Sequence, residues 1–374
     1  MRDKILFTPG PLSTSLSVKQ AMLRDLGSRD IEFIETVKEI RCSLVALGNL
    51  PSSQFTAIPM QGSGTFAVES VITSYVPKVN GKLFIVSNGS YGLRIEQIAK
   101  TLGLNIVHLN YPETQWPNLD EVEEVLKSQK DITNVACVHC ETSSGIINPV
   151  EKIGLLAQKH NPTATVFVDA MSSFGGVPLD IANSNIHFVV SSANKCIQGV
   201  PGFGFILAHK ERLLACAGQS RSLSLDLVAQ YKGLENEGQF RFTPPTHSLL
   251  AFRQAMRELV EEGGIEARSR RYQHNKAVLQ KGMEQFGFKE LLSPEVSSYV
   301  ITTYLFPSHP NFKFNEFYQR LNQKNFVIYP GKVTKADCFR IGSIGHLFPT
   351  DVEGLLGAIR DVCADMGVSL PLDK

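Results

Sequence analysis

Short apolar runs alternate with helical patterns between Phe55 and Ala208, and this rhythm constrains the fold more than any other feature of the sequence. The runs are continuously apolar, which is typical of strands covered by helices on both faces. Such alternation predicts a mostly parallel, doubly wound α/β sheet. We expect strands at Phe55–Pro59, Leu83–Ser87, Asn134–His139, Ala164–Val168, His187–Ser192 and Phe203–Ala208, and helices at Thr65–Ser74, Leu93–Thr101, Asp120–Ser128 and Glu151–His160.

The pattern changes after Thr246. A long helical stretch extends from His247 to about Gly287 and is interrupted at Gly263-Gly264. Shorter strand-like and helix-like segments follow, which predict a small α+β unit. We expect residues 1–264 to form an N-terminal arm and a large domain, and residues 265–374 to form a small C-terminal domain.

Composition and charge exclude several classes of partner. The chain has 37 basic and 36 acidic residues, and a net charge of +1 gives no reason to expect nucleic acid or an anionic membrane surface as a partner. No apolar run approaches the roughly 18 residues that a membrane helix needs. Pro9-Gly10 interrupts the apolar stretch that a secretory signal would require. We therefore expect a cytoplasmic protein.

Seven scattered cysteines argue against a framework of disulfides. Cys137 and Cys140 have the CxxC spacing, which leaves a metal or redox site as an alternative. However, no second pair completes a zinc site. Residues three apart on the strand predicted here also point to opposite faces. We expect no metal site.

Polar residues follow the ends of the predicted strands. In an open parallel sheet, ligands bind beyond the carboxyl ends of the strands, so these residues should share one edge. They are the turn Gly62–Thr65 before a predicted helix, the loop Glu141–Gly145, Asp169, and Lys195. The sequence thus predicts an anion cradle, a polar loop, an acid and a lysine at one edge of the sheet.

Each of these features has a structural alternative when it is taken alone. The cradle resembles many strand-to-helix turns, Asp169 could cap a helix or sit in a turn, and Lys195 could be a surface lysine. His139, at the end of an apolar strand, fits a hydrogen-bonded core histidine better than an acid or base. The combination favours pyridoxal phosphate, because its phosphate needs donors, its ring nitrogen a carboxylate and its aldehyde an amine.

The chain resembles the class V aminotransferases, in the fold-type I alanine–glyoxylate and serine–pyruvate group, over nearly its whole length. The motifs that carry the resemblance are Phe7–Leu12, Gln61–Thr65, Ser87–Gly92, Asp169–Gly176, Ser191–Gly202, Arg221–Asp226 and Cys338–Gly342. The runs Asn194–Gly199 and Arg221–Asp226 are similar to those of the branch that acts on phosphonates. The resemblance implies a fold-type I transferase dependent on pyridoxal 5'-phosphate, with a mostly parallel seven-stranded sheet and a small C-terminal α+β domain.

The resemblance also implies roles for individual residues. Lys195 would bond the cofactor aldehyde and later move a proton, and Asp169 would keep the ring nitrogen protonated. Arg340 would hold the anionic end of each substrate. The residues implied to bind the cofactor are Ser63, Gly64 and Thr65 at its phosphate, Tyr91 on its ring, Thr142 near its ring hydroxyl, Asp169, Ser192, Asn194, Lys195, and Thr243 at the phosphate in the neighbouring subunit.

The activity implied by the resemblance is transfer of the amino group of 2-aminoethylphosphonate to pyruvate. The implied assembly is a homodimer with shared active sites. One alternative is an aminotransferase that uses glyoxylate, alanine or serine. Another, from a different class, is a non-catalytic protein that only binds pyridoxal phosphate, and in such a protein Arg340 would have no role.

Overall fold

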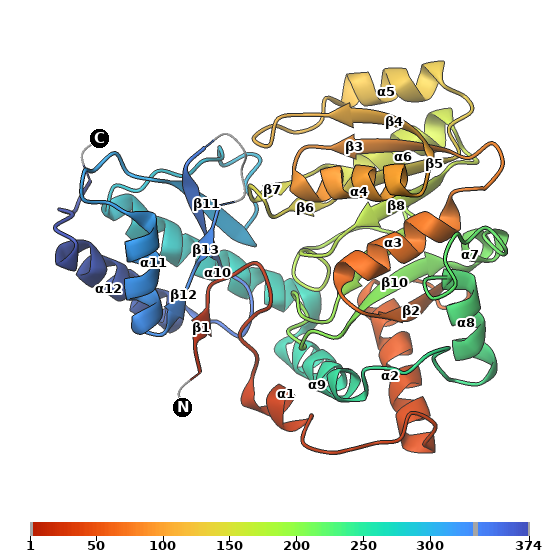
Figure 1. Ribbon diagram of the computed structural model, residues 1–374, viewed down its shortest axis with the longest axis horizontal. Coiled ribbons are helices and arrows are strands. Elements are labelled where there is room, and N and C mark those ends of the chain that lie inside the picture. Colours follow the sequence, from red (N-terminus) through yellow and green to blue (C-terminus); the bar gives the residue numbers. More distant parts are fainter. Residues whose placement is uncertain (1–2, 332–335, 373–374) are drawn as a thin grey trace.

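A seven-stranded sheet forms the centre of the larger part of the protein (Figure 1). The structure is a computed structural model that describes residues 3–331 and 336–372. Every strand runs parallel to its neighbours except β10, which is antiparallel to both. The predicted mostly parallel sheet is confirmed. Its strands, in spatial order, are β2 (Phe55–Gln61), β10 (Phe203–His209), β9 (Phe188–Ser192), β8 (Thr165–Asp169), β5 (Asn134–Val138), β3 (Lys82–Ser87) and β4 (Asn105–Asn110).

Six of these strands lie on the six predicted apolar runs, whereas β4 was not located from the sequence. β4 is an edge strand, and none of its residues is fully buried. Its sequence, Asn-Ile-Val-His-Leu-Asn, therefore lacks the continuous apolar run that marks the central strands.

Helices cover both faces of the sheet (Figure 1). Helices α3 (Gly64–Tyr75) and α4 (Ser90–Thr101) lie together on one face, and α5 (Leu119–Ser128) and α6 (Val150–His160) lie on the other. All residues of β5 and β9 are buried, as expected for a sheet covered in this way. The other elements of this part are α1 (Leu16–Gln20), α2 (Ile31–Leu47), α7 (Lys210–Ala215), α8 (Leu227–Asn236), α9 (Thr246–Glu262) and the small hairpin of β6 (Cys140–Glu141) and β7 (Ile146–Ile147).

The predicted interruption of the long helical stretch is confirmed at Gly263. This residue has φ of 106°, a left-handed conformation that ends α9 and allows α10 (Gly264–Gln285) to begin in a new direction. Helix α10 then crosses from the large sheet toward the C-terminal part of the protein (Figure 1).

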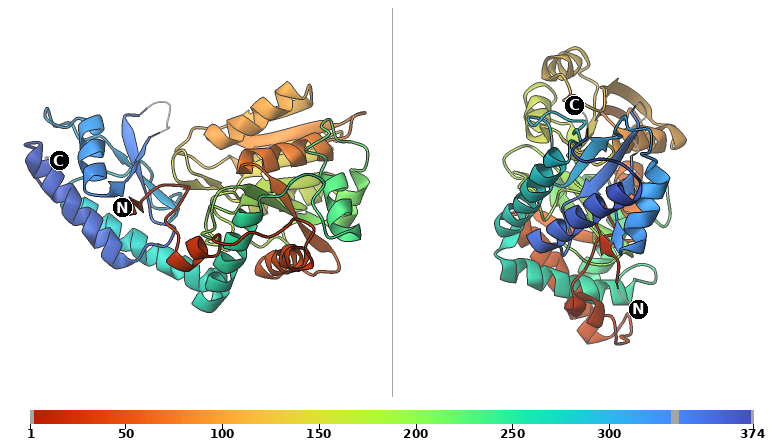
Figure 2. Two further views of the ribbon diagram at one scale, coloured as in Figure 1. Left: turned by 60° about the horizontal axis from the view of Figure 1, so that its bottom comes forward. Right: turned by 90° about the vertical axis from the view of Figure 1, so that its left-hand side faces the viewer.

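The C-terminal part is a small α+β unit with its own apolar core. Helix α12 packs along α10 (Figure 2). At the other end of the chain, β1 (Ile5–Leu6) pairs in parallel with β12, and the buried Phe7 belongs to the C-terminal core. In the described part of the chain, no helix is long and apolar enough to cross a membrane. The elements of this unit are β11 (Ile301–Leu305), α11 (Phe314–Gln323), β12 (Phe326–Val327), β13 (Tyr329–Pro330), β14 (Cys338–Gly342) and α12 (Pro349–Asp365).

Candidate active site

The carboxyl edge of the large sheet opens on a cavity of about 490 Å³. Parallel strands end at the same edge, so residues far apart in the sequence meet there. All of the predicted cofactor residues line this cavity except Thr142 and Thr243. Those that line it are Ser63, Gly64, Thr65, Tyr91, Asp169, Ser192, Asn194 and Lys195.

The predicted cradle is the N-terminus of α3. Ser63 is the N-cap residue, and its hydroxyl makes no capping hydrogen bond. The first N–H groups of a helix lack intrahelical partners and carry the positive end of the helix dipole, so this turn attracts an anion. A side chain at Gly64 would overlap that of Met171, so glycine at this position allows the turn to pack closely against the segment after Asp169.

Arg94 is a cation of the site that the sequence analysis missed. It lines the same cavity, and its Nη1 donates to Thr65 Oγ1 over 3.3 Å. Its guanidinium carbon also lies 5.0 Å from the centre of the Tyr91 ring. The sequence feature that could have indicated this role is the position of Arg94 three residues after Tyr91. This spacing places both side chains on one face of α4.

Asp169 ends β8 and is buried. Its Oδ1 accepts a hydrogen bond from the Met171 N–H over 2.9 Å, and no helix begins after it. Burial raises the pKa of Asp169 to about 6, although the Met171 N–H and the charges of Arg94 and Lys195 act in the opposite direction. A positively charged ring nitrogen at this carboxylate would favour its ionised form.

Lys195 lies in the connection from β9 to β10, and its Nζ donates to the Pro9 carbonyl over 2.7 Å. Burial lowers the pKa of Lys195 to about 8, the charge of Arg340 adds to this, and nearby Cys196 and Asp169 oppose it. The N-terminal arm approaches closely because residue 10 is glycine: a Cβ there would lie 2.5 Å from Lys195 Nζ. A lowered pKa supplies the neutral amine that attacks a carbonyl.

Arg340 is 1% exposed in β14 and adjoins the cavity without lining it. Its Nη1 donates to the Thr142 carbonyl over 2.6 Å, and its Nε and Nη2 donate to the Pro330 carbonyl. Among the residues that the structure describes, no carboxylate lies within ion-pair distance of this guanidinium. The Arg340 guanidinium carbon also lies 5.3 Å from the centre of the Tyr329 ring. A buried cation that has carbonyl and aromatic partners but no carboxylate is suited to bind an external anion.

Thr142 and Thr243 lie outside the lining of the cavity. The hydroxyl of Thr142 is buried and has no hydrogen-bond partner within residues 3–331 and 336–372, so it is available to a ligand. Thr243 is exposed between α8 and α9, where Gln61 Nε2 donates to its carbonyl over 3.4 Å. Its assignment to the neighbouring subunit stays a prediction.

Glu141 is a second residue whose role the sequence did not reveal. It is fully buried, and its carboxylate accepts hydrogen bonds from the N–H groups of Tyr91 and Gly92, each over 3.0 Å. Burial raises the pKa of Glu141 to about 7, and these N–H groups oppose that shift. Glu141 thereby holds the first turn of α4, from which Tyr91 projects.

The candidates that precede the polar loop, His139 and the two cysteines, are structural. His139 is buried, its Nδ1 lies 2.9 Å from Ser173 Oγ, and burial lowers its pKa to about 4, so the core-histidine interpretation is confirmed. Cys137 and Cys140 are free and buried, and burial raises the pKa of both thiols, that of Cys140 to about 12. In the described part of the chain, no three His, Cys, Asp or Glu side chains are grouped as metal ligands.

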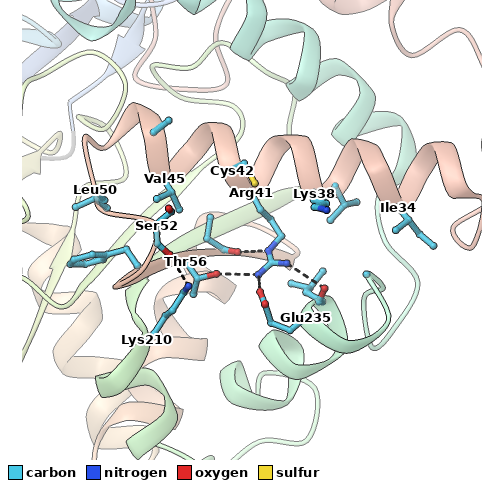
Figure 3. A pocket seen from close by; sticks show the side chains of 16 residues that line it. Ile34, Lys38, Arg41, Cys42, Val45, Leu50, Ser52, Thr56, Lys210 and Glu235 are labelled. Carbon is cyan, nitrogen blue, oxygen red and sulfur yellow. Dashed lines mark hydrogen bonds and ion pairs between the residues drawn. The ribbon is translucent and has the colours of Figure 1, made fainter.

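A larger cavity, of about 720 Å³, lies between α2, β2 and α8 (Figure 3). Three of its charged groups, those of Arg41, Glu235 and Lys210, already have protein partners. The Arg41 guanidinium donates to the Ala57 carbonyl and Thr56 Oγ1 and pairs with Glu235, and Lys210 Nζ donates to the Ser52 carbonyl. We therefore assign the chemistry to the cavity at the sheet edge.

Comparisons with known proteins identify the family. Residues 14–334 match the family described as aminotransferase class-V. The chain belongs to this family. A 2-aminoethylphosphonate–pyruvate transaminase of Vibrio vulnificus (strain YJ016) is 52% identical over 360 residues, which cover 96% of this chain and 97% of that relative.

Two further proteins extend the comparison. A bifunctional phosphonoacetaldehyde hydrolase/aminoethylphosphonate transaminase of Clostridioides difficile (strain 630) is 48% identical over 359 residues, which cover 96% of this chain and 56% of that relative. The crystal structure of a ureidoglycine–glyoxylate aminotransferase from Bacillus subtilis superposes with a TM-score of 0.89, covering 99% of this chain and 95% of that one. At 22% identity, that likeness concerns the fold alone, and it confirms the predicted fold-type I architecture.

Class V aminotransferases depend on pyridoxal 5'-phosphate, and the residues of the cavity fit this cofactor. The N-terminus of α3 and Arg94 offer donors and positive charge to a phosphate. Asp169 offers a buried carboxylate to the ring nitrogen, and Lys195 an amine to the aldehyde. The buried Thr142 hydroxyl, which has no hydrogen-bond partner in the described part of the chain, offers one further polar group to the cofactor.

The pKa of Lys195 gives a testable pH dependence. Only the neutral amine attacks the cofactor aldehyde, so the rate of covalent attachment to the cofactor-free protein should rise with pH and level off above about pH 8. The measurement is the rate of the absorbance change after mixing with pyridoxal phosphate. A rate that keeps rising toward pH 10.5, the usual value for lysine, would contradict the assignment.

Proposed function

We propose that this aminotransferase transfers the amino group of 2-aminoethylphosphonate to pyruvate, giving phosphonoacetaldehyde and L-alanine. The observation that carries the proposal is the buried Arg340 guanidinium, which has carbonyl partners and no carboxylate in the described part of the chain. The amine donor ends in a phosphonate and the acceptor in a carboxylate, so one planar cation can hold both in turn. The identity of about half with transaminases named for these substrates supports the same choice.

Each side chain of the site has a separate role in the proposed reaction. When bound, pyridoxal phosphate supplies an electron-accepting ring and an aldehyde that bonds to amines. Asp169 holds the proton on the ring nitrogen, and Lys195 Nζ takes a proton from the reacting carbon and returns it. Ser63, Gly64 and Thr65 bind the phosphate together with Arg94, and Tyr91 covers the ring.

The two substrates use the same pocket one after the other. Arg340 anchors the anionic end of each, which places the reacting carbon near Lys195. The first substrate leaves its nitrogen in the site and departs before the second enters, so the kinetics should be ping-pong. A protein that only stored the cofactor would have no use for the unpaired Arg340.

A comparison of amino donors tests the proposal. We expect the specificity constant for 2-aminoethylphosphonate with pyruvate to exceed those for alanine or serine with glyoxylate. The measurement is initial-rate kinetics with each pair at saturating cofactor. If alanine with glyoxylate is the preferred pair, the substrate assignment is wrong and the family assignment stands.

Replacement of Arg340 tests how the anions are held. Arg340→Lys keeps the charge but loses the two-pronged hydrogen bonding, and one charge-assisted hydrogen bond is worth roughly 1.5–3 kcal/mol. We expect the specificity constants for 2-aminoethylphosphonate and for pyruvate to fall about tenfold to hundredfold, with cofactor affinity nearly unchanged.

The matched control for this replacement is Arg257→Lys, on the exposed face of α9, where Arg257 pairs with Glu39. This variant should keep both specificity constants. If Arg340→Lys weakens only cofactor binding, Arg340 is not the substrate anchor.

We further propose a cytoplasmic homodimer with shared active sites, whose subunits divide at residues 264 and 265 into a large and a small domain. In this arrangement, Thr243 contacts the cofactor phosphate in the neighbouring subunit. The exposure of Thr243 and its absence from the lining of its own subunit's cavity support this assignment.

Hybrid dimers test the sharing of sites. A dimer of one Lys195→Ala subunit and one Thr243→Ala subunit should contain one intact site, made of Lys195 from the second subunit and Thr243 from the first. We expect the purified hybrid to recover about half of the normal activity at a cofactor concentration too low to load the Thr243→Ala homodimer. If Thr243 serves its own subunit, the hybrid has no intact site and stays inactive under these conditions.

A further inference from the structure

Gln198 has an unusual position in the lysine loop, the connection from β9 to β10 that carries Lys195. It is 3% exposed, and its φ of 67° places a residue other than glycine in the left-handed region. Its N–H donates to the Lys195 carbonyl over 2.7 Å, which closes the turn that follows the lysine. A buried residue in this strained conformation suggests that its side chain has a specific task.

The side chain of Gln198 reaches out of the large sheet to the small C-terminal unit. Its Nε2 donates to the carbonyl of Gly345 over 2.7 Å and to Tyr272 Oη over 2.6 Å. Gly345 lies three residues after β14, the strand that contains Arg340. One amide group therefore links the lysine loop to the segment that follows the substrate arginine.

Tyr272, from α10, completes the link. Its hydroxyl accepts from Gln198 Nε2 and from the Gly345 N–H, and it donates to the Cys196 carbonyl. One donor and two acceptor positions are the whole capacity of a hydroxyl, so Tyr272 Oη is fully used. It joins the residue after Lys195 to the segment after Arg340.

Two arginines of α10 hold the same carbonyl groups. Arg268 Nη1 donates to the Cys196 carbonyl over 2.7 Å, and Arg271 Nη1 donates to the Gly345 carbonyl over 2.9 Å. Both guanidinium groups pair with Glu262, at the end of α9. Since each carbonyl receives two donors, the lysine loop and the segment after β14 are fixed to one helix.

We propose that Gln198 is a positioning residue that sets the distance between Lys195 and Arg340, and thereby the length of substrate that the site accepts. This rests on the proposed function, because 2-aminoethylphosphonate must reach both residues at once. Two carbons separate its amine from its phosphonate, so a displacement of either residue weakens the fit. Gln198 itself does not need to touch the substrate.

Gln198→Asn tests the proposal, because asparagine tolerates left-handed backbone but is too short to bridge the gap. The shorter side chain loses the hydrogen bonds of Gln198 Nε2 to the Gly345 carbonyl and to Tyr272 Oη. We expect the specificity constant for 2-aminoethylphosphonate to fall about tenfold, while that for 3-aminopropylphosphonate falls much less. The preference for the shorter donor should therefore decrease. Tyr272→Phe, which keeps the ring in the core, should have the same effect.

Hydrogen exchange gives a readout that does not depend on turnover. The amide of Gly345 donates to Tyr272 Oη, and the carbonyl of Gly345 accepts from Gln198 Nε2. Each variant therefore removes one contact of this segment, and peptides covering residues 341–348 should exchange faster in both. The control is Asn134→Ala, which removes a buried amide bonded to the Tyr75 carbonyl in the large sheet. It should lower stability without changing the preference between donors or the exchange of residues 341–348.

The outcomes separate this proposal from the proposed function. If the Gln198 and Tyr272 variants lose activity equally with both donors, or if exchange of residues 341–348 is unchanged, the positioning role is wrong. If the unaltered protein ignores both aminophosphonates, the proposed function is wrong, and the exchange measurement still decides whether the link holds the two segments.

Discussion

Two buried charged groups that form no ion pair with a side chain in the described part of the protein determine what this site can bind. Asp169 and Arg340 are both nearly inaccessible to solvent, and in the described part of the chain their hydrogen-bond partners are backbone groups. Leaving such charges unbalanced costs several kcal/mol, so the folded protein is adapted to ligands that supply the missing charges. In the proposed function, the protonated ring nitrogen of the cofactor supplies the positive charge next to Asp169, and the anionic end of a substrate supplies the negative charge next to Arg340. The large sheet, the N-terminal arm and the small C-terminal unit together hold Asp169 and Arg340 in place.

The parts of the fold and site that depend on local sequence could be predicted. Central strands are apolar over most of their length because both faces are covered, and Asp169 ends one of them while Lys195 lies three residues after another. Edge strand β4 was not predicted, because its residues are partly buried or exposed and its sequence is therefore not continuously apolar. Arg94, Glu141 and Gln198 could not be assigned roles, because each acts through contacts between distant segments: Gln198 and Gly345 are 147 residues apart.

The division of the chain into a large sheet and a small unit explains why the site requires several connections between them. Lys195 belongs to the first and Arg340 to the second. The N-terminal arm connects them on one side, since β1 pairs with β12 and the Pro9 carbonyl accepts from Lys195. Helix α10 connects them on the other side through Tyr272, Arg268 and Arg271. A short substrate bound at both ends depends on each of these contacts.

The most direct test of this account is a half-reaction followed by absorbance. The cofactor-loaded protein is mixed with 2-aminoethylphosphonate in the absence of pyruvate, and the absorbance of the lysine-bound cofactor is recorded. We expect this absorbance to disappear as the amino group passes to the cofactor, and to return when pyruvate is added. No change with 2-aminoethylphosphonate, together with a full change on addition of alanine, would contradict the assignment of Arg340 to a phosphonate substrate.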